Sequence, residues 1–177
     1  MADHSAPSVL IAENLILNRV REIATQIQRD YEGRPLTVLG IFNGSFIFLA
    51  DLLRNLSLPL QMDSMVVSSY RGKNSTGMVQ VQQCSERCHL SDHDILVVDD
   101  ILETGLTLEA IQKHLLDLEP MPRSIEFCIL LRKNCPRKCE INARYVGFDI
   151  ANEFVVGYGL DFNGQYRNLP YIGVLQV

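Results

Sequence analysis

Hydrophobic residues along the chain follow two spacings in turn, and these spacings predict helices and strands. Four aliphatic residues recur at intervals of four, three and four: Ile16, Val20, Ile23 and Ile27. That spacing places them on one face of an amphipathic helix, which Gly33 and Pro35 end. The next apolar run, Leu36–Phe42, is continuous, as in a strand that is buried on both faces. The first predicted unit is therefore a helix followed by a buried strand.

The same order continues to the end of the chain. Helical spacing recurs through Phe48 and Leu52 and again through Leu108, Ile111 and Leu115. Further apolar runs predict strands at 65–68, 79–81, 95–98, 127–131, 145–148, 154–156 and 172–175. Strands that alternate with helices favour an α/β fold with a mostly parallel sheet, covered by helices on both faces. A chain of 177 residues fits one such domain.

Composition narrows the class of protein. Hydrophobic residues make up 47% of the chain and charged residues 21%, and no apolar run reaches the roughly 18 to 20 residues of a membrane span. Residues 1–8 are small and polar and resemble a frayed terminus rather than a signal peptide, so we expect a cytoplasmic protein. The net charge of −5 argues mildly against a nucleic-acid surface.

Five cysteines, an odd number, fit reduced thiols better than a disulfide framework. A zinc site is the alternative, because cysteine and histidine gather at two places: Cys84, Cys88, His89 and His93, then Cys135 and Cys139. Both cysteine pairs have the spacing Cys-x3-Cys, and the more diagnostic spacing is Cys-x2-Cys. We therefore interpret the cysteines as structural.

The run at 95–111, ILVVDDILETGLTLEAI, carries the clearest chemistry. The predicted strand at 95–98 delivers Asp99 and Asp100 at its carboxyl end, where open α/β sheets bind ligands. A short turn then places four residues at the start of a helix: Thr104, Gly105, Leu106 and Thr107. Free backbone N–H groups and threonine hydroxyls there favour a phosphate. Carboxylates beside a phosphate repel it, so the arrangement implies a bridging hard cation such as Mg²⁺.

The string VVDDILETGLTL at 97–108 resembles the phosphoribosyl-diphosphate signature of the type I phosphoribosyltransferases. Four further segments are similar to the hypoxanthine-guanine phosphoribosyltransferases: GIFNGSFIFLADL at 40–52, SSYRGKNSTG at 68–77, LLRKNCPR at 130–137 and FVVGYGLDFNGQYRNLPYIGV at 154–174. The resemblance covers nearly the whole chain. It implies a small hood built from the N-terminal residues and roughly 145–172, small-molecule substrates, and homodimers or homotetramers.

The resemblance also implies roles for individual residues. Asn43 and Gly44 would contact pyrophosphate in a loop that often holds a non-proline cis bond, expected at Asn43-Gly44, and Arg167 would also meet pyrophosphate. Lys133, Phe154, Val155 and Asp161 would surround the purine, with Lys133 on its 6-oxo group and Phe154 stacked on the ring. Asp99, Asp100 and Asp161 would hold Mg²⁺, and Ser69 and Tyr70 would close a lid.

The reaction implied is transfer of ribose 5-phosphate from phosphoribosyl diphosphate to N9 of hypoxanthine or guanine. Glu103 matches the position of the catalytic base, where the family normally carries aspartate. One added methylene can displace the carboxylate by about an ångström, so we expect retained but slower catalysis. The alternative is a non-catalytic regulator with the same fold that binds nucleotide or RNA.

Overall fold

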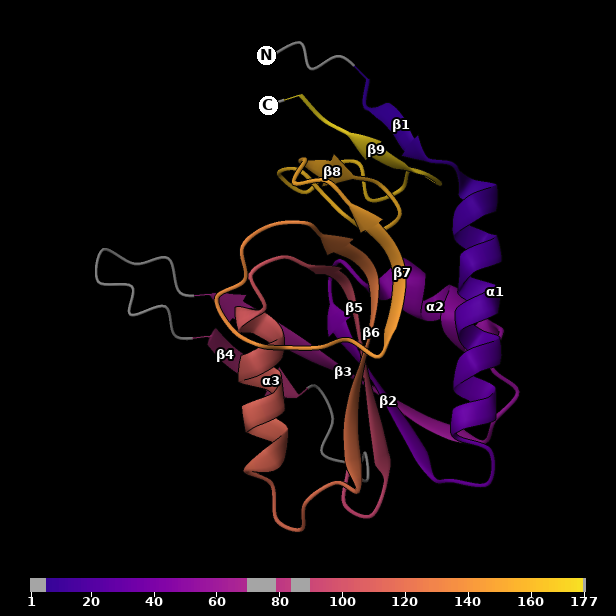
Figure 1. Ribbon diagram of the computed structural model, residues 1–177, viewed down its shortest axis with the longest axis vertical. Helices are drawn as coiled ribbons and strands as arrows, with labels where there is room; N and C mark the ends of the chain where they lie inside the picture. Colours follow the sequence, from indigo (N-terminus) through magenta and orange to yellow (C-terminus); the bar gives the residue numbers. More distant parts are fainter. Residues whose placement is uncertain (1–5, 70–78, 84–89, 177) are drawn as a thin grey trace.

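The computed structural model describes residues 6–69, 79–83 and 90–176, and its centre is a six-stranded sheet of order β4-β3-β2-β5-β6-β7. The strands are β2 (Leu36–Phe42), β3 (Leu60–Ser69), β4 (Val79–Gln83), β5 (Asp94–Leu102), β6 (Ser124–Lys133) and β7 (Tyr145–Ile150). Five of them run parallel, and β4 pairs antiparallel with β3 at one edge. The predicted mostly parallel sheet is confirmed (Figure 1).

Helices cover both faces of this sheet (Figure 1). Helices α1 (Glu13–Asp30) and α2 (Phe46–Arg54) lie on one face, and α3 (Leu106–Leu116) lies on the other. Side chains alternate across β5 accordingly. Leu96 and Val98 pack in the core under α1 and α2, whereas Ile95 and Val97 pack under α3. Burial on both faces explains why the strands read as continuous apolar runs.

A second, antiparallel sheet of order β1-β9-β8 lies beyond the carboxyl ends of the parallel strands (Figure 1). It consists of β1 (Ser8–Ile11), β8 (Val155–Val156) and β9 (Ile172–Val174), so both termini contribute to it. Its position fits the hood implied by the sequence. The sequence pattern missed β1 and predicted a frayed end as far as residue 8. Only the last of the four β1 residues is buried, so no periodicity marks this strand.

Five strands, β3 to β7, are longer than the sequence predicted, and the differences in β3 and β5 are examples. β3 begins at Leu60 rather than residue 65, and β5 continues to Leu102 rather than ending at residue 98. The reason for the second difference is the register. β2 pairs with β5 only as far as Val98, whereas β6 stays paired with β5 as far as Leu102. Asp99 and Asp100 therefore lie within the strand rather than after it, on the stretch that β2 no longer covers. Among the described helices, none is long and apolar enough to cross a membrane.

Candidate functional site

Two adjacent carboxylates lie where β5 loses its neighbour β2. Asp99 is 6% exposed, and its Oδ1 accepts the N–H of Asp100 at 3.0 Å. Burial raises the pKa of Asp99 well above its ordinary value, and the charge of Asp100 and a hydrogen bond between the two carboxyl groups raise it further. Burial also raises the pKa of Asp100. Two carboxylates that resist ionisation side by side form a site suited to a cation.

The turn between β2 and α2 packs directly against this pair. A Cβ atom at Gly44 would lie 1.7 Å from Oδ2 of Asp100, so only glycine allows this approach. Asn43 immediately precedes it, and the non-proline cis peptide bond is Phe42-Asn43. The expected position at Asn43-Gly44 was wrong by one bond, because the cis bond joins the last residue of the strand to the turn. The sequence-predicted residues Asn43 and Gly44 thus lie beside the carboxylates.

The start of α3 forms the other wall of the site. Gly105 precedes the helix with a φ of +89°, a left-handed conformation that glycine adopts without strain, and among the described residues no side chain caps the helix. Free N–H groups of Leu106 and Thr107 are therefore available to an anion. A cavity of about 250 Å³ joins Thr107 to Asp99, Asp100 and Gly44. A second, of about 180 Å³, is lined by 101–105 and 107–108. The predicted anion cradle stays a prediction, and these free N–H groups and cavities are compatible with it.

Glu103 and Lys133 come from the ends of neighbouring strands. Oε2 of Glu103 lies 3.6 Å from Nζ of Lys133, and the Lys133 side chain is 10% exposed against 50% for Glu103. The pairing of Leu102 with Arg132 in the sheet brings them together. A carboxylate and a buried ammonium therefore meet at the same edge of the sheet, where one accepts protons and the other only donates hydrogen bonds.

Asp161 and Arg167 form an ion pair beside the same edge. Arg167 Nη2 lies 2.6 Å from Asp161 Oδ1, and Arg167 Nη1 donates to the carbonyl oxygen of Gly159. The N–H of Gly164 donates to Asp161 Oδ2 at 2.7 Å. The positive charge of Arg167 partly offsets the effect of burial on the pKa of Asp100, so this guanidinium lies within electrostatic range of that carboxylate. Both oxygens of Asp161 already have partners within the chain.

Two aromatic side chains contact each other, and one of them immediately precedes β8 of the small antiparallel sheet. Phe154 is 40% exposed and meets the ring of Phe162 edge to face, with centroids 5.5 Å apart. Val155 is buried in β8. Sequence reasoning did not assign Phe162 to the site, because nothing in the sequence set it apart from the other aromatic residues of the same Gly-rich segment. Ser69 is the last residue of β3, and Tyr70 lies outside the described residues.

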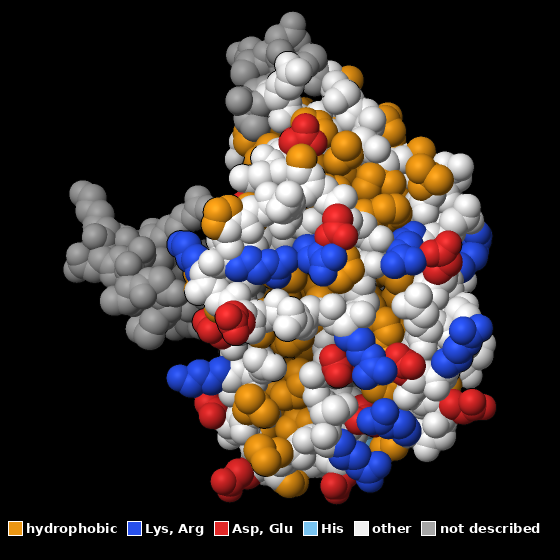
Figure 2. Space-filling view, viewed as in Figure 1, with side chains coloured by type: hydrophobic (Ala, Val, Ile, Leu, Met, Phe, Trp, Pro, Cys, Tyr) orange, Lys and Arg blue, Asp and Glu red, His pale blue; other side chains and the backbone are white. Residues whose placement is uncertain are grey.

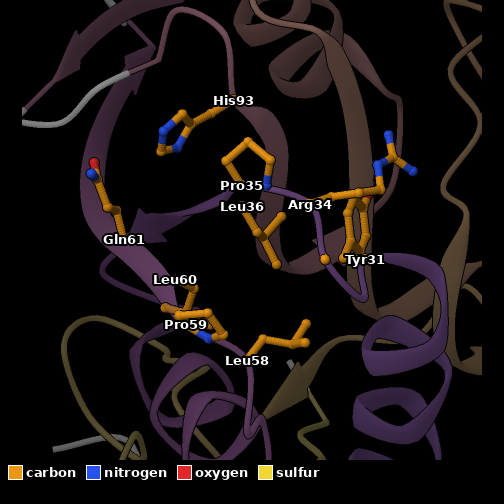
Figure 3. Close-up of a pocket in the computed structure, with 10 residues that line it drawn as sticks. Tyr31, Arg34, Pro35, Leu36, Leu58, Pro59, Leu60, Gln61 and His93 are labelled. Carbon is orange, nitrogen blue, oxygen red and sulfur yellow. The ribbon is translucent and has the colours of Figure 1, made fainter.

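The largest of these cavities lies elsewhere. About 480 Å³ opens near the amino ends of the parallel strands, and Figure 3 shows Pro35, Leu36 and Leu58 around it. Its lining is mainly apolar. No group of three potential metal ligands occurs among the described residues, and Cys84, Cys88 and His89 of the zinc alternative fall outside them. The functional candidates gather at the opposite, carboxyl ends of the strands.

Comparisons with known proteins show what the whole chain is similar to. The family model "Phosphoribosyl transferase domain" matches residues 10–163. A hypoxanthine-guanine phosphoribosyltransferase of Staphylococcus epidermidis is 45% identical over 170 residues, which cover 96% of this chain and 93% of that protein. The crystal structure of a hypoxanthine phosphoribosyltransferase from Staphylococcus aureus has a TM-score of 0.87 at 44% identity and covers 96% of this chain and 91% of that one.

A further solved structure is a mutant of a related protein. It is the glutamic acid mutant from an analysis of an invariant aspartic acid in HPRTs, with a TM-score of 0.86 at 37% identity. The match covers 95% of this chain and 94% of that one. The fold shared with this chain therefore accepts a glutamic acid in place of that aspartic acid.

Proposed function

The chain belongs to the phosphoribosyltransferase family, and from this premise we propose that it is a purine-salvage transferase. It transfers ribose 5-phosphate from phosphoribosyl diphosphate to N9 of hypoxanthine or guanine, and pyrophosphate leaves. The observation that carries this proposal is the Asp99-Asp100 pair, of which Asp99 is buried and Asp100 partly buried, beside the uncapped start of α3. Acidic groups next to an anion cradle suit a substrate that carries phosphates, ribose hydroxyls and a bridging cation.

The residues present fit Mg²⁺. Among the described residues, Asp99 and Asp100 form no ion pair with a lysine or arginine, although Asp99 is buried and Asp100 is partly buried. Asp161 does not group with these two carboxylates in the part of the chain that the structure describes, and it would instead hold Mg²⁺ that is bound to pyrophosphate, since a carboxylate oxygen in a hydrogen bond keeps a lone pair free. When bound, the ion would neutralise pyrophosphate as negative charge develops on it. Asp99 and Asp100 would also hold the ribose hydroxyls.

The phosphate groups would meet donors from three segments. Thr104, Gly105, Leu106 and Thr107 would bind the 5-phosphate through N–H groups and hydroxyls. Asn43 and Gly44 would contact pyrophosphate through the turn that already touches Asp100. The planar guanidinium of Arg167 would bind the leaving pyrophosphate, where its charge stabilises the transition state.

Lys133 would select the base. An ammonium group only donates, so it satisfies the 6-oxo group of hypoxanthine or guanine and is left unpaired and desolvated by the amine of adenine. Its buried position makes an unpaired state costly. The half-exposed ring of Phe154 would stack on the purine, and the backbone of Val155 would meet its exocyclic edge. Glu103 lies beside Lys133, so its carboxylate would come within reach of N7 once the ammonium engages the base.

Glu103 would be the general base. As N9 attacks the anomeric carbon, the N7 proton becomes acidic, and a carboxylate at hydrogen-bond distance accepts it, an effect worth about 10² to 10⁴ in rate. The longer side chain reaches to 3.6 Å from Lys133, and this attraction would divert it from N7 until a purine engages the ammonium. We therefore propose active but slower catalysis than with aspartate at this position.

The remaining expectations are proposed on the same basis. Ser69 and Tyr70 would close over the sugar and exclude water from it. The chain would act as one domain, with a hood of the N-terminal residues and roughly 145–172. A cytoplasmic homodimer or homotetramer fits the family. The competing hypothesis is a regulator that binds RNA, and such a protein needs a continuous basic surface. On the face that Figure 2 shows, basic side chains are interspersed with acidic ones.

The deciding experiment mixes the protein, phosphoribosyl diphosphate and Mg²⁺ with hypoxanthine, guanine, xanthine or adenine in separate reactions. We expect nucleotide from hypoxanthine and guanine and none from adenine. The Lys133→Gln variant serves as the matched specificity control, and it should lose most of its discrimination against adenine. If none of the four bases gives nucleotide, the transferase function is contradicted.

A further inference from the structure

The loop that follows β6 donates hydrogen bonds to the turn that carries Glu103. Two thiols of this loop reach consecutive carbonyl oxygens of the turn. Cys135 Sγ donates to the Glu103 oxygen at 3.6 Å, and Cys139 Sγ donates to the Thr104 oxygen at 3.7 Å. The N–H of Lys138 donates to the same Thr104 oxygen at 3.0 Å. The position of the turn therefore depends on two cysteines that the proposed reaction does not use.

Gly105 makes this contact possible. A Cβ atom at Gly105 would lie 2.7 Å from the sulfur of Cys139, so the thiol occupies the space that a side chain would fill. Burial raises the pKa of Cys139, which keeps its proton in place for the bond to Thr104. The sulfur thus packs against the first residue of the phosphate cradle. Any change at this sulfur acts directly on the start of α3.

Both thiols are free and partly exposed, so they are accessible to a small oxidant. A cavity of about 440 Å³ borders Cys139 and is also lined by Arg132 and Arg137. Arg132 is paired with Asp149, whereas Nη1 of Arg137 donates only weakly, at 3.4 Å, to the carbonyl oxygen of Ile141. Guanidinium groups beside a thiol favour a reactant that carries carboxylates.

We propose that Cys135 and Cys139 form a reversible disulfide by exchange with a low-molecular-weight disulfide that carries carboxylates, and that this bond lowers transfer activity. The proposal concerns regulation of the proposed active site and rests on that function. Its structural basis is the pair of thiols on consecutive carbonyls of one turn, next to an arginine-lined cavity.

The exchange balances in two steps. One protein thiol loses its proton to water, and its thiolate attacks a sulfur of the small disulfide, so that a mixed disulfide forms and a small thiolate leaves and is protonated. The other protein thiol then loses its proton and attacks the mixed disulfide, which releases the second small thiol. The two protein thiols are oxidised by two electrons, and the small disulfide is reduced to two thiols.

Formation of the bond removes both S–H donors from the turn. The sulfurs must come within about 2.05 Å of one another, so they leave the oxygens of Glu103 and Thr104. Only the N–H of Lys138 then holds the turn from this side. A shift of about 1 Å in the carboxylate of Glu103 or in the phosphate cradle costs about 10²-fold in rate. We expect the oxidised enzyme to be between about 10-fold and 100-fold slower.

The test uses the full chain with Cys84→Ser and Cys88→Ser, which leaves Cys128, Cys135 and Cys139. Reduced protein is equilibrated with oxidised and reduced glutathione, alkylated and mapped by mass spectrometry, and its activity is measured before and after dithiothreitol. We expect one cross-linked peptide pair that joins Cys135 to Cys139, with activity lost and then restored. Cys135→Ser and Cys139→Ser retain a hydroxyl donor, and both should resist inhibition.

Three outcomes separate this proposal from the function on which it rests. A glutathione adduct on a single thiol, or a Cys135-Cys139 bond with unchanged activity, would overturn the switch. If the reduced protein makes no nucleotide, the proposed function fails, and the same peptide map still tests the disulfide. The peptide map and the reversal by dithiothreitol use protein that retains Cys135 and Cys139. They therefore test the disulfide switch even if Cys135→Ser or Cys139→Ser folds poorly.

Discussion

The two ends of β5 treat buried carboxylates in opposite ways. At the amino end, Asp94 is fully buried, and its Oδ1 accepts hydrogen bonds from Arg34 and Ser124, each at 2.6 Å. At the carboxyl end, Asp99 is also buried and Asp100 is partly buried, yet among the described residues neither forms an ion pair. The chain neutralises one carboxylate itself and leaves the other two for a ligand. One end of the strand serves stability, and the other serves binding.

The cavities at the two ends show the same division. The cavity near Arg34 and Leu36 is the larger, at about 480 Å³, and its lining is mainly apolar (Figure 3). The cavity at Asp99 and Asp100 has about 250 Å³ and an acidic wall. Size therefore does not mark the reactive end of this sheet. Buried charge that the chain leaves unpaired marks it, because such charge costs stability and persists where function requires it.

The largest effect is expected from Glu103→Gln at the carboxyl end. This change should lower the turnover number by about 10² to 10⁴, because the amide cannot accept the purine proton. The unfolding midpoint should stay the same, since the side chain is 50% exposed. Steady-state kinetics and thermal unfolding measure the two quantities. Asp149→Asn, at an exposed ion pair with Arg132, is the control, and full activity of the Gln variant would exclude Glu103 as the base.

Asp94→Asn should have the largest effect on stability. It weakens a buried, charge-assisted bond, so the free energy of unfolding should fall by about 1.5 to 3 kcal/mol in denaturant titrations. Turnover per folded molecule should be unchanged, because the residue lies at the opposite end of the strand from the site. Ser124→Ala, which removes the weaker partner, should cost about 1 kcal/mol. A large loss of turnover in folded Asp94→Asn would contradict the assignment of stability to the amino end of β5 and of binding to its carboxyl end.

Asp99→Asn should raise the free energy of unfolding, whereas Asp94→Asn should lower it. Without metal or substrate, the amide can donate to Asp100 as the protonated Asp99 does, and it removes a charge that burial disfavours. We expect the free energy of unfolding at neutral pH to rise by about 1 kcal/mol, while Mg²⁺-dependent turnover falls strongly. Denaturant titration without Mg²⁺ measures the first effect. Destabilisation similar to that of Asp94→Asn would mean that both ends of β5 are structural.

The sequence predicted this division only in part. Continuous apolar runs predicted the parallel strands, because burial on both faces leaves no alternation to misread. The motif at 97–108 also indicated the acidic pair and the anion cradle. The extent of β5 was not predictable, since it depends on where β2 stops pairing at Val98. The partners of Asp94 were not predictable either, because Arg34 and Ser124 are distant in sequence and meet only through the sheet register.

The smallest predicted effect is a pH dependence that belongs to the carboxyl end alone. The pKa of Asp99 is raised in the folded protein, so this group favours the folded state fully below its ordinary value of 3.8 and loses that contribution as pH rises through the raised pKa. The advantage of Asp99→Asn should therefore be largest at neutral pH, shrink as pH falls, and vanish near the ordinary pKa. Denaturant titrations of both proteins from about pH 8 to about pH 4 measure it. An advantage that stays constant with pH would show that Asp99 has the same pKa in the folded and the unfolded protein, and the burial effect that distinguishes the two ends of β5 would then be absent.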